Sequence, residues 1–449
     1  MPGIEIVPSA KRLMKSLRDM GYDFAQAIAD VVDNSIESGA SLVAIDVEFD
    51  GDDSWVRIAD NGKGMKPDRL REAMRYGAER EYGKDDLGKF GLGLKTASMS
   101  QCQCLSVASR WNPHRADVAA YSWDLDHIER TNRWEILPLE GNDLTKAIRE
   151  PLKGATGTVV LWQRLDRILG YKHPYGEAAR KRLFQTCREI ELHLGMVFHR
   201  FIAAEARNNR FKLLLNGNEV KAWDPFCRTE TKTKVLQAIT IPVEHEGASG
   251  EVLIEPFVLP HQDDFSSPDA FRNASGPANW NQQQGFYIYR AGRMIQSGGW
   301  SNLRSPDEHM KLARIAVSFS PALDEAFKIN VAKMRVQMPS MIRDAVRQAI
   351  GPVMKLARES YDRKPVRSPN PPANSAISTV KNTNASSTHA ITTGDGSFGA
   401  LPCSQDPLED ERSKRSSLLS FEEWSDLTLK TATKEERPMV EAILKRLQS

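Results

Sequence analysis

Three groups of polar and glycine residues near the start of the chain have spacings that suit nucleotide chemistry. In the first, Asp30 and Asn34 stand four residues apart in a stretch with helical spacing, so they share one helix face. A carboxylate placed there can orient and deprotonate a water molecule, and an amide oxygen can ligate magnesium, which prefers oxygen donors. The alternative is a solvent-exposed acidic helix face with Asp33 and Glu37, and this group taken alone favours that simpler interpretation.

The second group is the run DNGKGM, which begins at Asp60 directly after an apolar stretch. Gly62 and Gly64 permit a tight turn with open backbone. Asp60 at the end of a strand can accept a hydrogen bond from an exocyclic amine such as that of adenine. A buried contact of this kind discriminates strongly, because the wrong base leaves the carboxylate unpaired. A plain hairpin turn that carries an aspartate explains the same residues equally well.

The third group is the run GKFGLGLKTAS, in which Gly88, Gly91 and Gly93 precede a helix-like stretch. Backbone N–H groups at a glycine-rich helix start bind phosphate, and Lys95 would add a positive charge there. The run is neither a P-loop nor a dinucleotide fingerprint, because GxxxxGK[ST] and a GxGxxG directly after a strand do not occur. A flexible surface loop is the alternative. The polar residues 67–87 before it are a candidate lid over a phosphate site.

Helices and strands must position these groups. Residues 25–37 show apolar side chains at helical spacing, residues 42–49 alternate as a half-buried strand, and WVRIAD at 55–60 forms the next strand. The order helix, strand, strand suits a sheet covered on one face by helices. Further along, GFYIYRAGRMI at 285–295 predicts a strand, a turn and a strand.

Composition divides the chain into four regions. Residues 1–206 mix helical and strand patterns, and residues 211–361 are rich in strands and end in a helix. Residues 362–415 are rich in Pro, Ser, Thr and Asn, which predicts a disordered linker, because such a stretch buries too little apolar surface to offset chain entropy. Residues 416–449 regain apolar residues at helical spacing, and we expect this short helical tail to dock on the body or on a partner.

The bulk composition excludes several classes. A chain of 449 residues with 40% hydrophobic residues can form two or three domains. A net charge of +2 with 27% charged residues gives no whole-chain signature of nucleic-acid binding, so any basic surface must be local. No apolar run predicts a membrane span or a secretory signal, so a cytoplasmic protein without membrane contacts is expected. Five scattered cysteines indicate reduced thiols rather than a zinc site.

In their order and spacing, the motifs resemble the GHKL ATPase superfamily of gyrase, heat-shock chaperones, histidine kinases and MutL. DVVDNSIESGA is similar to its N-box, DNGKGM to its adenine-binding box, GKFGLGLK to its second glycine box, and TGTVVLW to a motif whose threonine supports the adenine aspartate. The resemblance covers most of residues 1–360 and is strongest to bacterial MORC and MutL-like ATPases. It implies an α+β fold, with a two-layer α/β sandwich (the Bergerat ATP-binding fold) over residues 1–206 and a transducer-type βαβ domain over 211–361.

The resemblance also implies roles for individual residues. Asp30 stands at the position of the general base, and Asn34 at that of the magnesium ligand. Lys333, in FKINVAKMRVQMP, stands at the transducer lysine that reaches the γ-phosphate and assists catalysis. The implied nucleotide-binding residues are Asn34, Asp60, Gly62, Gly64, Met65, Gly88, Phe90, Gly91, Leu92, Gly93, Lys95 and Thr158.

Two features complicate these assignments. Relatives usually have glutamate at the position of Asp30, and aspartate is one methylene shorter, which puts the rate of hydrolysis in question but not the binding of ATP. Lys232 and Lys234 in the basic loop RTETKTK compete with Lys333 for the lysine role. They rank lower, because no strand motif surrounds them.

The implied activity is hydrolysis of ATP to ADP and phosphate, with ATP and Mg²⁺ as cofactors. The family further implies a homodimer that closes as a clamp when ATP binds. MORC and MutL relatives act on DNA, so we expect DNA as the substrate, in a restriction or defence-type setting. The sequence shows no nuclease-like cluster of His, Asp and Glu, so a nuclease or methylase partner protein would have to act on the DNA.

Three alternatives come from other classes of protein. A sensor histidine kinase needs a phosphoacceptor histidine upstream of the N-box, and residues 1–25 contain none. A heat-shock-type chaperone needs a large client and dimerisation region after the transducer domain, where this chain has the predicted linker. A non-hydrolysing, ATP-sensing interaction protein is the third alternative, and Asp30 in place of glutamate is its best support.

Overall fold

The computed structural model describes residues 3, 6–19, 21–78, 93–114, 117–206, 210–329 and 336–363. All of them lie within one compact unit, residues 1–367. Residues 364–449, which contain nearly all of the predicted linker and the whole predicted tail, lie outside the described residues. None of the described helices is both long enough and apolar enough to cross a lipid bilayer.

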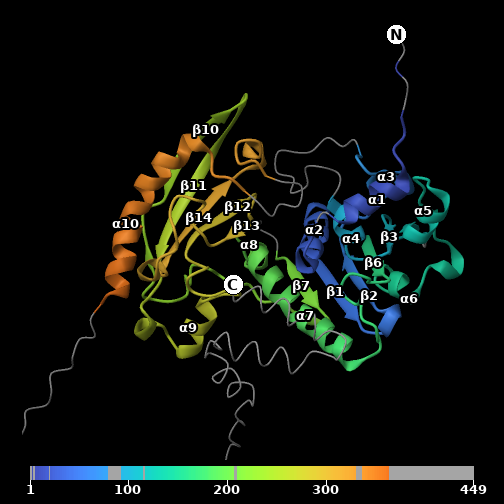
Figure 1. The fold of residues 1–449 in the computed structure, drawn as a ribbon, viewed down its shortest axis with the longest axis horizontal. Coiled ribbons are helices and arrows are strands. Elements are labelled where there is room, and N and C mark those ends of the chain that lie inside the picture. The colour runs from blue at the N-terminus through green and yellow to red at the C-terminus, as the bar shows by residue number, and fades with distance from the viewer. Residues whose placement is uncertain are drawn as a thin grey trace, which may run out of the picture. The chain divides into compact units, whose positions relative to one another are not determined.

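The fold is α+β, and its first part is an eight-stranded sheet (Figure 1) with the order β5-β4-β3-β6-β2-β1-β7-β8. Neighbouring strands are antiparallel, except that β1 and β7 run parallel. The predicted strands at 42–49 and 55–60 are confirmed as β1 and β2. The strands are β1 (Leu42–Glu48), β2 (Trp55–Asp60), β3 (Cys104–Arg110), β4 (Ala119–Asp124), β5 (Leu137–Pro138), β6 (Gly157–Gln163), β7 (Lys212–Leu215) and β8 (Asn218–Glu219).

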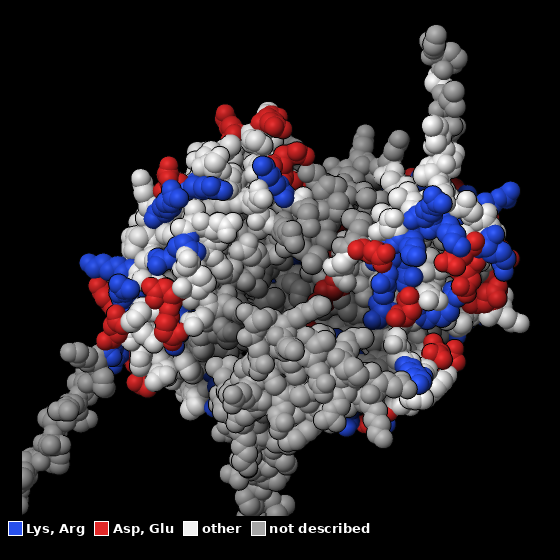
Figure 2. All heavy atoms as spheres, in the orientation of Figure 1, with Lys and Arg blue, Asp and Glu red and all other residues white. Residues whose placement is uncertain are grey.

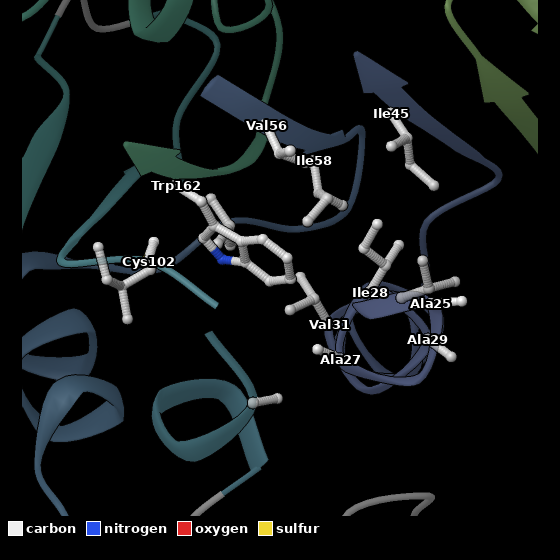
Figure 3. Packing of buried hydrophobic residues seen from close by; sticks show 14 of the residues in the cluster. Ala25, Ala27, Ile28, Ala29, Val31, Ile45, Val56, Ile58, Cys102 and Trp162 are labelled. Carbon is white, nitrogen blue, oxygen red and sulfur yellow. The ribbon is translucent and has the colours of Figure 1, made fainter. Parts of the chain in front are cut away.

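The main core lies between one face of this sheet and its helices. The helices of this part are α1 (Ala10–Arg18), α2 (Phe24–Glu37), α3 (Pro67–Met74), α4 (Gly93–Met99), α5 (Leu125–Thr131), α6 (Lys146–Arg149), α7 (Glu177–Val197) and α8 (His199–Ile202). The predicted helix at 25–37 is confirmed as α2, which begins after Asp23, whose side chain accepts a hydrogen bond from the backbone of Ala25. Figure 3 shows Ile28 and Val31 of α2 facing the sheet residue Trp162.

Successive side chains of β6 point to opposite faces of the sheet, and six of its seven residues are buried. The strand is therefore covered on both faces. Val160 and Trp162 belong to the main core. Val159 and Leu161 belong to a smaller cluster on the opposite face, which includes Ile148 of α6. Helices therefore cover one face of the sheet, as expected, and α6 also covers part of the other.

The second part is a six-stranded sheet with the order β10-β11-β14-β12-β13, in which β9 also pairs with β11. Figure 1 shows α10 (Arg343–Tyr361) lying along β11 and β14, and α9 (Pro268–Ala274) belongs to the same part. The strands are β9 (Lys234–Val235), β10 (Ile239–His245), β11 (Ala248–Val258), β12 (Gly285–Arg290), β13 (Arg293–Ser297) and β14 (Ala313–Phe319). β12 and β13 confirm the predicted strand, turn, strand at 285–295.

The boundary between the two parts differs from the prediction. A second region was expected from residue 211, but β7 and β8 extend the first sheet, because β7 pairs with β1. The second sheet therefore begins after Glu219. The pairing joins segments far apart in the sequence, so composition could not reveal it.

Candidate nucleotide-binding site

Asp60 ends β2, and donors hold its carboxylate from several sides. Its Oδ1 accepts hydrogen bonds from the backbone N–H groups of Gly62 at 2.8 Å and Thr158 at 3.3 Å, and its Oδ2 accepts one from the hydroxyl of Ser35 at 3.0 Å. These three hydrogen bonds fix the orientation of the carboxylate. Burial raises the pKa of Asp60, and the same hydrogen bonds oppose the rise.

Thr158 lies directly opposite Asp60 in the β2–β6 register. Its hydroxyl is 3.0 Å from that of Ser109 on β3, which also accepts a hydrogen bond from the backbone N–H of Met65 at 2.8 Å. The structure therefore brings together Asp60, Thr158 and Met65 through Ser109, a residue that sequence reasoning missed. Ser109 belongs to no motif, and only the strand register reveals it.

Gly62 and Gly64 carry the backbone close to neighbouring groups. A Cβ on Gly64 would lie 2.0 Å from the carbonyl oxygen of Arg110, and the φ of Gly64 is +66°. A Cβ on Gly62 would lie 1.9 Å from the hydroxyl of Ser38. Both positions need glycine because the loop after Asp60 has no room for a side chain.

Asp30 and Asp33 of α2 are buried, against the alternative of a solvent-exposed acidic face. Arg293 of β13 donates through Nη2 to Oδ1 of Asp30 at 3.1 Å, and through Nε to a carboxylate oxygen of Asp33 at 2.9 Å. Arg293 is only 1% exposed. Buried carboxylates need such a partner, because burying an unpaired charge is costly. The candidate base therefore lies in an ion cluster that joins the first part of the fold to the second.

Two further side chains surround Asp30. Gln26 donates through Nε2 to Oδ1 of Asp30 at 3.3 Å, and its Oε1 lies 3.1 Å from Nε2 of His193 on α7. Burial, with a contribution from Arg293, lowers the pKa of His193 to about 4, so the ring is neutral at neutral pH and Nε2 carries its proton. Burial and the charge of Asp30 raise the pKa of Tyr22, which keeps its proton.

Asn34 follows Asp30 by one helical turn and is exposed. Its Nδ2 donates to the backbone carbonyl oxygen of Asp30 at 3.0 Å, which leaves Oδ1 as the acceptor of the group. This exposed oxygen on an anchored side chain fits magnesium, which binds proteins through one or two oxygen ligands together with phosphates.

Lys95 is buried on α4, which begins at Gly93. Its Nζ donates to the carbonyl oxygen of Ala73 on α3 at 3.1 Å, and burial lowers its pKa to about 8. The predicted nucleotide-binding residues Gly88, Phe90, Gly91 and Leu92 lie outside the described residues, and so does Lys333.

The competing lysine loop ends in a two-residue strand, which corrects the expectation that no strand lies beside it. Lys234 begins β9, and its Nζ donates to the hydroxyl of Ser360 on α10 at 3.2 Å. Its amine is therefore directed to α10, although Lys234 and Lys232 are both exposed.

A separate cavity of about 820 Å³ lies beside α1 and α3. Its lining includes Leu13, Met74, Tyr76, Trp123 and Trp134, and is mostly apolar. No described residue of the candidate nucleotide site lines it.

Residues 22–158 match the family model of histidine kinase-, DNA gyrase B-, and HSP90-like ATPases. Curated relatives include the DNA mismatch repair protein MutL of Haemophilus influenzae (strain PittGG), 26% identical over 48% of this chain and 30% of the relative. MutL of Shewanella denitrificans is 24% identical over 59% of this chain and 40% of the relative, and MutL of Salmonella arizonae is 26% identical over 48% and 31%. The chain thus spans less than half the length of these relatives.

The matched segment contains the residues that the structure brings together. It begins before α2 and ends at Thr158, so it holds Asp30, Asn34, Asp60 and the turn that follows Asp60. The resemblance to bacterial MORC proteins stays a prediction. Residues 22–158 belong to the GHKL ATPase superfamily, and the chain that carries them is MutL-like.

Proposed function

We propose that this chain binds ATP with Mg²⁺, hydrolyses it to ADP and phosphate, and closes as a dimeric clamp during the cycle. One observation carries the proposal. α2 holds Asp30, Asn34 and Ser35, and Ser35 donates to Asp60 at 3.0 Å. A single rigid helix therefore positions the candidate base, the candidate magnesium ligand and the candidate adenine contact, and catalysis depends on such fixed geometry.

In this proposal, each end of ATP has its own contacts. Asp60 accepts a hydrogen bond from the exocyclic amine of adenine, supported by Thr158. Oδ1 of Asn34 would hold magnesium, and the ion would neutralise charge on the phosphates. The glycine-rich residues 88–93 and Lys95 bind the phosphates.

Asp30 is the proposed general base. It orients a water molecule and takes a proton from it as the water oxygen bonds to the γ-phosphorus and the bond from that phosphorus to ADP breaks. Lys333 is proposed to stabilise the charge on the transferring phosphoryl group, as the family resemblance implies.

DNA is the proposed substrate of the clamp, with a restriction or defence-type role beside a nuclease or methylase partner. Support comes from the MutL relatives, which are named DNA mismatch repair proteins. Figure 2 shows basic and acidic side chains interspersed around α1, α3 and α5, so the described residues on that face form no broad basic patch. A gel-shift series over salt tests DNA contact, because binding through phosphates weakens as salt rises.

Phosphate release and ATP binding by the full chain test the hydrolytic role. Asp30→Asn should bind ATP and lose turnover by at least about 100-fold, the usual contribution of a general base. Asp33→Asn is the comparison, because it removes the other carboxylate that Arg293 binds and should lower turnover less than Asp30→Asn does. Full turnover in Asp30→Asn, or an equal loss in both variants, would refute the role of Asp30.

Lys333→Ala should lower turnover and leave ATP affinity nearly unchanged. An unchanged rate would contradict the proposed role and move it to Lys232 or Lys234. The hydrogen bond from Lys234 to Ser360 makes that transfer the less favoured result.

A second candidate function is a switch that binds ATP without hydrolysing it. The ion pair between Asp30 and Arg293 favours it, because the guanidinium occupies a carboxylate oxygen that a base needs for contact with the attacking water. Saturable, magnesium-dependent ATP binding without phosphate release would establish this alternative.

A further inference from the structure

We propose that Arg293 is a positioning residue for Asp30, through which the second sheet sets the orientation of the candidate base. The inference rests on the proposed hydrolysis. It assigns a role in turnover to a residue 263 positions away from Asp30 in the sequence and outside the segment that matches the ATPase family.

Arg293 makes a two-pronged contact with α2. Its Nη2 binds Asp30 and its Nε binds Asp33, three residues later on the same helix face. The planar guanidinium offers its donors in a fixed fork, so two simultaneous bonds fix its orientation relative to the helix. Gln26 and Arg293 both donate to Oδ1 of Asp30, and together they set the rotation of that carboxylate.

The hairpin that carries the arginine is itself fixed against the first part of the fold. Its turn includes Gly292, where a Cβ would lie 2.6 Å from Cβ of Ala206. On β12, the hydroxyl of Tyr289 is 2.8 Å from Nε2 of His199, and the guanidinium of Arg200 lies 3.6 Å from the centre of the tyrosine ring. A shift of this hairpin would therefore move the guanidinium relative to α2.

A purely structural role would give a different result from a positioning role. Loss of a buried cation would destabilise the protein in either case, because two buried carboxylates lose the charged group that binds them both. A positioning role additionally predicts lower turnover in molecules that are folded and bind ATP normally, since small misplacement of a catalytic group slows the chemical step.

The test compares Arg293→Lys and Arg293→Met with Arg314→Lys in the full chain. Arg314 is a matched control on β14, fully buried, and its described hydrogen bonds go to the carbonyl oxygens of Pro225 and Ala274 in its own part of the fold. For each variant, the dissociation constant of a fluorescent ATP analogue, kcat for phosphate release and the melting temperature are measured, with kinetics well below melting.

We expect Arg293→Lys to lower kcat about 10-fold and Arg293→Met about 100-fold, with the dissociation constant within about 3-fold of wild type in both. Lysine should rescue part of the loss because it keeps the charge and loses the fork. Arg314→Lys should leave kcat within about 2-fold, although its melting temperature falls.

Three results would overturn the inference. One is wild-type kcat in Arg293→Lys. Another is a fall in kcat that follows melting temperature equally in the Arg293 and Arg314 variants. The third is wild-type protein that binds ATP and releases no phosphate, which removes the proposed hydrolysis as well. Normal wild-type turnover with unaffected Arg293 variants refutes only the positioning role.

Discussion

The hydroxyl of Ser35 donates to Oδ2 of Asp60 at 3.0 Å, and this bond ties α2 to the end of β2. Ser35 directly follows Asn34, so the helix that presents the candidate magnesium ligand also supports the candidate adenine contact. The two ends of a bound nucleotide would therefore be held by one element.

Ser35→Ala should weaken ATP binding by about 5- to 10-fold, because a part-buried carboxylate loses a donor worth roughly 1–1.5 kcal/mol. The loss should grow at low pH, since removal of a hydrogen bond to the ionised form raises the pKa of Asp60 further. Titration with a fluorescent ATP analogue measures it. Ser16→Ala, an exposed helix serine bonded to Arg12, is the control, and equal affinities in both variants would contradict the prediction.

Gly64→Ala should destabilise the protein by more than about 2 kcal/mol, since it adds a close contact to a strained φ. Gly39→Ala is the matched control, because Gly39 has a φ of +78° and nothing within 4 Å of an added Cβ. Urea unfolding of both variants separates the cost of the contact from that of the dihedral. If Gly64→Ala were no worse than Gly39→Ala, the close approach to Arg110 would not be important.

ATP affinity should fall as pH rises from about 7 to about 9. Burial lowers the pKa of Lys95 to about 8, so its ammonium is mostly charged below that pH and mostly neutral above it. The attraction for phosphate is therefore present at lower pH and lost through this window. Lys95→Arg should remove the pH dependence, since arginine stays charged, and Lys95→Met should bind weakly throughout this pH range. An unchanged profile in both would show that Lys95 does not contact phosphate.

Stability should decline as pH falls from about 6.5 towards 4, partly through His193. Its pKa is lowered to about 4 in the folded state, so the unfolded chain binds more protons within this window, and unfolding becomes easier as pH falls. His193→Gln should reduce this decline by roughly 1–2 kcal/mol. Chemical denaturation at several pH values measures the slope, and identical slopes for wild type and variant would argue against the titration of His193.

The local elements of this fold follow from local patterns. The helical spacing of Ile28 and Val31 predicts α2. The structure shows that these two residues lie in the main core against the sheet, and this packing explains why the pattern is present in the sequence. Strand alternation predicts β1 and β2, and the run GFYIYRAGRMI predicts the hairpin, whose turn residues Ala291 and Gly292 both have positive φ.

Contacts between distant segments could not be predicted in this way. The sequence alone favours a solvent-exposed acidic helix face for Asp30 and Asp33. Arg293, which binds both carboxylates, comes from the second sheet, and local spacing could not reveal this contact. Ser109 belongs to no motif, and its contact with Thr158 depends on the register of β3 and β6. The predicted boundary at 206–211 failed for the same reason, because β7 joins β1 across the intervening chain.

The shared burial of Asp30, Asp33 and Arg293 also limits how this protein can change over evolution. A neutral residue at any one of the three positions alters the charge balance of a buried ion cluster. We therefore expect substitutions at the three positions to occur together among homologues. A chimera that takes residues 285–297 from a relative should fold only when the acidic pair on α2 comes from the same parent.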